Sequence, residues 1–117
     1  KTIYDPCPFG WKVPYGGDLN VWATANDSPM IFNGTWSTSY GMNFKTHFGT
    51  SVTTWYPAAG YRKGLDGELC DVGSAGFYWS TAPSADAIAG FMFSSSSNVL
   101  PIYYGKADAC SVRCIKE

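Results

Sequence analysis

Four cysteines in a chain of 117 residues constrain this fold more than any other feature of the sequence. They are Cys7, Cys70, Cys110 and Cys114. An even number of cysteines in a small, loop-rich chain is typical of proteins made in an oxidising compartment. The sequence alone leaves three pairings open. A zinc site is the alternative, but Cys110 and Cys114 are the only closely spaced pair and have no further Cys or His nearby.

The composition favours strands over helices. Aromatic residues make up 17% of the chain and charged residues 15%, with 13 Gly and 7 Pro, so we expect a folded domain of short strands. Residues 17–25 are the best helix candidate, because Leu19, Trp22 and Ala23 have helical spacing. Residues 30–50 show no clear period and predict loop with short pieces of structure. We therefore expect one α+β domain over residues 1–117, with short antiparallel strands, one or two helices and long loops.

Several function classes are excluded by what the sequence lacks. The net charge is -1 and Lys and Arg do not cluster, so a nucleic-acid partner is not expected. No apolar run reaches the length of a transmembrane helix, so this domain is not expected to insert directly into a membrane. Sequence motifs of hydrolases, zinc proteases and phosphate loops are missing, and His47 has no activated partner near it in the sequence. We do not expect an enzyme.

One loop carries a weak candidate for calcium. Asp66, Glu68 and Asp71 lie close together in the sequence and would supply hard oxygen ligands. Their spacing does not match an EF-hand, and acidic residues in a turn are usually solvated. The main expectation is therefore that the domain holds no metal and no cofactor.

Two further residues are expected to have structural roles. Trp11 in "GWKVP" should pack in the core together with Val13, since a tryptophan among apolar residues is usually buried. Arg113 in the closing "SVRC" lies in an expected central strand. It would need acceptors there, from backbone carbonyls or from an acid such as Asp5.

Four segments carry a family resemblance, in the same order as in the family. They are "DPCPFGWKVP" at residues 5–14, "YPAAGYR" at 56–62, "VGSAGFYWS" at 72–80 and "SVRC" at 111–114. In these segments the chain resembles the Fibrobacter succinogenes major paralogous domain, found in surface proteins of Bacteroidetes. The resemblance extends from Tyr4 to Cys114 and is weakest over residues 27–50. Cys70 and Cys110 depart from the family pattern.

The resemblance implies a C-type lectin-like fold in which the N- and C-terminal strands are adjacent. Cys7 and Cys114 occupy family positions, and adjacent terminal strands would bring them to bonding distance. Cys70 and Cys110 could form a second bridge or remain free thiols. The sugar-binding tripeptides of calcium-dependent lectins are absent from the chain, so that mode of sugar binding is not implied.

The family also implies a function. It includes ligand-binding domains of pilus tips and lipoproteins, and variable proteins of diversity-generating retroelements. We therefore expect a non-enzymatic, adhesin-like ligand-binding domain at the C-terminus of a larger secreted protein. That protein would lie on the bacterial cell surface as an outer-membrane lipoprotein or as part of a pilus. Its ligand would be a protein or a glycan. The alternative is a structural module of a surface protein with no ligand of its own.

A tolerant surface is expected near the C-terminus. Ile88, Phe91 and Phe93 would supply the buried face, and the positions between the framework residues would point outward. Leu100, Ile102, Tyr103 and Tyr104 would form an apolar and aromatic patch of the kind that marks interaction sites. The predicted ligand-binding or variable positions are Ala82, Ser84, Asp86, Ala87, Ala89, Gly90, Leu100, Ile102, Tyr103, Tyr104, Gly105, Asp108 and Cys110.

Diversification makes a prediction that genomic sequence can test. A retroelement of this kind changes adenines, chiefly in Asn codons, and every residue type in the predicted set is reachable from such a codon. Met92 and Lys106 are not reachable and stay outside the set. We expect a neighbouring reverse transcriptase gene and a near-copy of the DNA for residues 78–114 that differs only at adenines. Absence of both would leave a fixed adhesin surface.

Overall fold

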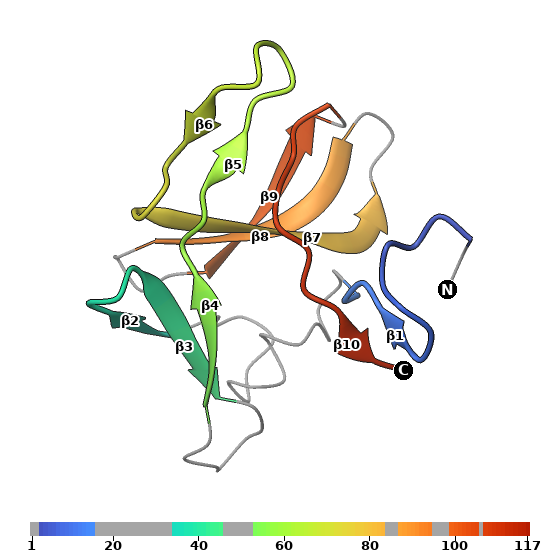
Figure 1. Cartoon of the computed structure of the whole chain (residues 1–117), viewed down its shortest axis with the longest axis horizontal. Helices are drawn as coiled ribbons and strands as arrows, with labels where there is room; N and C mark the ends of the chain where they lie inside the picture. The colour runs from blue at the N-terminus through green and yellow to red at the C-terminus, as the bar shows by residue number, and fades with distance from the viewer. Residues whose placement is uncertain (1–2, 16–33, 46–52, 84–86, 95–98, 106) are drawn as a thin grey trace.

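The computed structural model describes residues 3–15, 34–45, 53–83, 87–94, 99–105 and 107–117 (Figure 1). These residues form short strands joined by turns and loops. The strands are β1 (Trp11–Lys12), β2 (Thr35–Ser37), β3 (Gly41–Lys45), β4 (Thr53–Pro57), β5 (Tyr61–Arg62), β6 (Leu69–Cys70), β7 (Ala75–Pro83), β8 (Ala87–Ser94), β9 (Val99–Gly105) and β10 (Ile115–Lys116).

The expected α+β, C-type lectin-like class is wrong for the described part of the chain, which is all-β and contains no helix. The described segments are short, rich in aromatic residues and separated by turns, a composition that suits strands rather than helices. The helix expected at residues 17–25 lies outside the described residues. The segment 30–50, expected to be loop with short pieces of structure, contains the short strands β2 and β3. Within the described ranges, no helix is long and apolar enough to cross a membrane.

Two three-stranded antiparallel sheets make up most of the structure. One has the strand order β2-β3-β4, and the other β7-β8-β9. Two smaller pairs, β5-β6 and β1-β10, complete the described strands. Each larger sheet pairs strands that are neighbours in the sequence.

Strand β7 is the centre of the molecule because both of its edges are occupied. One edge pairs with β8. Along the other edge, the Gly60 amide donates to the Ala75 carbonyl, Ser111 exchanges hydrogen bonds with β7, and the Thr81 amide donates to the Pro14 carbonyl. Three segments far apart in sequence therefore meet on one strand, which leaves little of its backbone unpaired.

The core lies between the two larger sheets. It contains Met42, Phe44, Tyr56, Ala58, Tyr78 and Phe93, with Trp36 packed against them. Phe93 stacks on Tyr78 at 5.9 Å between ring centroids and meets Phe44 edge-on at 5.7 Å. The Tyr78 hydroxyl donates to the Pro57 carbonyl at 2.8 Å, so this strand-to-strand contact is polar as well as apolar. Burial raises the pKa of Tyr78, and the Arg113 guanidinium opposes that rise.

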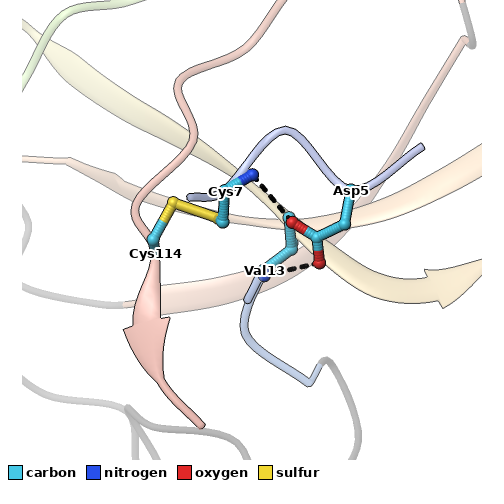
Figure 2. Close-up of a disulfide and its surroundings, with 4 residues drawn as sticks. All are labelled: Asp5, Cys7, Val13 and Cys114. Atoms are coloured by element: carbon cyan, nitrogen blue, oxygen red, sulfur yellow. Dashed lines mark hydrogen bonds between the residues drawn. A yellow bond between two sulfur atoms is a disulfide. The ribbon is translucent and has the colours of Figure 1, made fainter. Parts of the chain in front are cut away.

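The terminal segments are joined to each other, as the family resemblance implied. β1 pairs with β10 antiparallel, and a disulfide joins Cys7 to Cys114 with 5.8 Å between their Cα atoms (Figure 2). The Asp5 carboxylate accepts hydrogen bonds from the Cys7 and Val13 amides at 2.8 and 3.2 Å. It thereby shapes the loop that carries Cys7. The bridge spans 107 positions, and closing a loop of that size contributes about 4–5 kcal/mol in the chain-entropy model.

Trp11 and Arg113 give different outcomes. The prediction that Trp11 packs in the core is wrong, since this residue is 44% exposed, whereas Val13 is buried. Trp11 stands in a two-residue strand whose sheet has only two strands, which is too small to cover it.

Arg113 donates to the Trp55 carbonyl at 2.8 Å and lies 4.4 Å from the centre of the Tyr56 ring. A backbone carbonyl therefore supplies an acceptor, as predicted, but Arg113 lies before β10 and not in a central strand.

Candidate functional site

The predicted ligand-binding positions fall mainly on β7, β8, β9 and the segment after β9. Ala82 lies near the C-terminal end of β7, whereas Ser84 and Asp86 lie outside the described residues. The positions on β8 are Ala87, Ala89 and Gly90, and those on β9 are Leu100, Ile102, Tyr103, Tyr104 and Gly105.

The β8–β9 pairing fixes these positions relative to one another. The register is unbroken from the pair Ala87–Gly105 to the pair Phe93–Val99, and it matches Ala89 with Tyr103 and Gly90 with Ile102. The start of β8 and the end of β9 therefore lie at the same end of the sheet, next to the end of β7 (Figure 1). Since consecutive positions of a strand alternate between the two faces, positions 103 and 104 belong to opposite faces. The predicted set divides between both faces at this end of the sheet.

Gly90 does not fit a tolerant surface. It is buried, and an added Cβ would lie 2.7 Å from the Tyr78 carbonyl oxygen. No larger side chain fits there without a shift of the β7 backbone. We therefore remove Gly90 from the candidate site.

Asp108 and Cys110 connect this sheet to the β5–β6 hairpin. The Asp108 carboxylate accepts a hydrogen bond from the Gly64 amide at 2.8 Å, and Ala109 exchanges backbone hydrogen bonds with Arg62. Both predicted positions are partly buried rather than open. The contacts of Asp108 and Ala109 indicate a structural contribution, because they hold the hairpin against the segment that follows β9.

Cys70 and Cys110 are free thiols in the structure, so the second bridge that the sequence left open is absent. On one edge of β5, Tyr61 pairs with Cys70. On the other edge, Arg62 forms an antiparallel bridge with Ala109, and the next pair in that register is Tyr61 with Cys110. Two strand spacings amount to about 10 Å, whereas a disulfide needs Cα atoms within about 7 Å. The strand that carries Tyr61 therefore keeps the two sulfurs apart.

The Cys110 thiol lies in an environment that lowers its reactivity. Burial, with a smaller effect from the Asp108 carboxylate, raises the pKa of the Cys110 thiol to about 11. At neutral pH Cys110 is therefore protonated and a weak nucleophile.

The three acidic residues of the loop do not converge on one point. The Asp66 carboxylate accepts a hydrogen bond from the Glu68 amide at 2.9 Å, and Glu68 forms an ion pair with Lys63 at 2.8 Å. This Lys63 contact lowers the pKa of Glu68. Among the residues that the structure describes, no three His, Cys, Asp or Glu side chains gather closely enough to hold a metal ion. His47 lies outside the described residues.

The sequence analysis missed one exposed aromatic surface, on the β2-β3-β4 sheet. Trp55 of β4 is 42% exposed while its neighbour Tyr56 is buried, so the strand separates an outer face from the core face. Tyr40, in the turn before β3, is 67% exposed. The alternation of Thr54, Trp55 and Tyr56 was a usable signal, but the irregular pattern of residues 30–50 hid the partner strands.

Comparison of the chain with protein-family models, with curated proteins and with solved structures finds no match. The resemblance in the four sequence segments therefore remains a prediction, and function has to be inferred from the chain itself.

The cysteine arrangement predicts two alkylatable thiols. Treatment of the denatured, unreduced protein with iodoacetamide should add two carbamidomethyl groups, on Cys70 and Cys110, as peptide mass spectrometry can locate. Prior reduction should expose Cys7 and Cys114 as well. Recovery of a peptide in which Cys70 is linked to Cys110 would contradict the separation of the two sulfurs by Tyr61.

Proposed function

We propose that this chain is a non-enzymatic ligand-binding domain of a secreted, cell-surface protein, with adhesin-like activity. The observation that carries the proposal is the unbroken β8–β9 register, which holds the predicted contact positions on a paired sheet rather than on a loop. Sites on paired strands are more rigid than sites on loops, and rigid sites lose less entropy on binding.

The disulfide supports both the proposed location outside the cytoplasm and the proposed rigidity of the binding surface. A bridge between the two ends of the chain suits an oxidising compartment outside the cytoplasm. It also limits the opening of the terminal segments that line β7. On this proposal the protein is displayed on a bacterial surface, as an outer-membrane lipoprotein or as part of a pilus.

The residue types of the β9 positions favour a protein ligand over a glycan at this site. Positions 100, 102 and 104 share one face of β9 and position 103 belongs to the other, so each face carries a tyrosine. The residue types Leu, Ile and Tyr are apolar or aromatic, and tyrosine provides large contact area at low rotamer entropy. Whether these positions are diversified by a retroelement or fixed, their role in the proposal is the same. The competing proposal is a structural module with no ligand, and binding measurements separate the two.

The test uses surface plasmon resonance with immobilised fibronectin, laminin, type I collagen and mucin. We expect saturable binding to at least one of them, and loss of affinity of about tenfold or more in the variant Tyr103→Ala/Tyr104→Ala, since interface tyrosines often act as hot spots. The matched control is Tyr4→Ala/Tyr15→Ala, which removes two tyrosines that are 87% and 59% exposed elsewhere. Binding to none of the four, or equal loss in both variants, would favour the structural module.

A further inference from the structure

A second surface lies on the outer face of the β2-β3-β4 sheet, away from the core. The register places Thr35 opposite Asn43 and Asn43 opposite Trp55, so these three residues form one row across the sheet. Directly opposite residues of antiparallel strands share a face. The next row along the strands consists of Ser37, Gly41 and Pro57.

The Trp55 indole reaches across this face from β4 to β3. An added Cβ on Gly41 would lie 2.4 Å from the indole Nε1 atom, so the ring covers a position on β3 that only glycine leaves free. Trp55 nevertheless remains 42% exposed. The backbone beneath the ring is fixed, because the Trp55 carbonyl accepts the Arg113 hydrogen bond. The result is an aromatic platform on a rigid strand.

Uncharged hydrogen-bonding groups stand beside the platform. The Asn43 side chain can donate and accept, and the Thr35 hydroxyl can do both as well. Within the part of the chain that the structure describes, the side-chain amide of Asn43 has no hydrogen-bond partner. None of the residues in the two rows is charged.

The neighbouring turn has an unusual backbone. Tyr40 has φ 59, a left-handed conformation that is uncommon for a bulky residue. Its amide donates to the Ser37 carbonyl and its carbonyl accepts from the Ala58 amide, so the conformation is held from both sides. Tyr40 directly precedes Gly41 and is 67% exposed. Strained residues of this kind concentrate at binding sites.

We propose that this outer face binds a saccharide, with a pyranose ring stacked on the Trp55 indole and its hydroxyls bonded to Asn43 and Thr35. A sugar ring offers an apolar C–H face and a rim of hydroxyls, which matches an aromatic platform flanked by amide and hydroxyl groups. Lys45, which the register places on the same face beyond the two rows, opposite Thr53, is the one charged residue among the described positions of this face. The site is distinct from the β8–β9 positions of the proposed function and does not depend on them.

The size of the face argues against a second protein copy as the occupant. Its longest strands have five residues. At about 3.3 Å per residue and about 4.8 Å between strands, the face covers roughly 250 Å². A stable protein interface buries roughly 800 Å² on each partner. A small ligand therefore fits this face better than a protein does.

The test is an NMR titration of the ¹⁵N-labelled protein with cellotetraose, xylotetraose, β-1,4-mannotetraose, β-1,4-galactotetraose and tetraacetylchitotetraose. The indole N–H signal of Trp55 is assigned by its absence in Trp55→Phe. We expect at least one tetrasaccharide to shift this signal saturably. Trp55→Ala should weaken binding about tenfold or more, and Asn43→Ala should weaken it about threefold to tenfold.

Trp11→Ala is the matched control, because Trp11 is 44% exposed on a different sheet. It should leave saccharide affinity unchanged, as should Tyr103→Ala/Tyr104→Ala, so this test and that of the β8–β9 surface fail independently. The proposal is overturned if none of the tetrasaccharides shifts the Trp55 signal, or if Trp11→Ala loses as much affinity as Trp55→Ala. It is also overturned if Trp55→Ala converts a dimer into a monomer in light scattering, since the face would then be a self-interface.

Discussion

The hydrogen bonds between Ser111 and β7 are the interaction on which the rest of this structure depends. The Ser111 amide donates to the Phe77 carbonyl at 2.9 Å, and its carbonyl accepts from the Trp79 amide at 3.0 Å. These bonds fill the edge of β7 that β8 does not occupy. On either side of Ser111, Ala109 pairs with Arg62 and Arg113 reaches the Trp55 carbonyl. One short segment therefore joins the β5–β6 hairpin and both larger sheets.

The disulfide protects this arrangement by fixing the end of the same segment. Cys114 follows Arg113 and is bound to Cys7, whose loop is shaped by Asp5. A short segment held only by a few backbone hydrogen bonds would open readily in a domain of this size. Joining its end to the other terminus lowers the entropy of the opened state and so favours the paired one.

Both proposed surfaces are built on this frame. The β8–β9 positions lie on a sheet whose first strand is stabilised from its other edge, and Trp55 stands on a strand that Arg113 anchors through a backbone carbonyl. The Arg113 guanidinium also lies over Tyr56, the buried neighbour of Trp55. Preorganised backbone of this kind lets an exposed aromatic side chain bind without a large ordering cost.

The family resemblance implied the pairing of the terminal strands and the Cys7–Cys114 bridge, and the structure contains both. A backbone acceptor for Arg113, expected from the need to pair a partly buried charge, is confirmed as well. The exposure of Trp11 was not predicted, because burial depends on the strands that pack over a residue. A short sequence motif carries no information about those strands. The separation of Cys70 from Cys110 follows from the register around Tyr61, which is equally non-local. The outer face with Trp55 depends on pairing with β2 and β3, whose irregular residue pattern gave no strand signal.

Native-state hydrogen exchange of single amides, read by NMR, measures the central claim most directly. If the Ser111 segment is an integral part of the β7 sheet, the Ser111 and Trp79 amides exchange as slowly as the slowest amides of β7 and β8. They should then open only with the whole domain. The account is contradicted if the Ser111 amide exchanges as fast as that of Leu65, an exposed loop residue, while β7 and β8 remain protected.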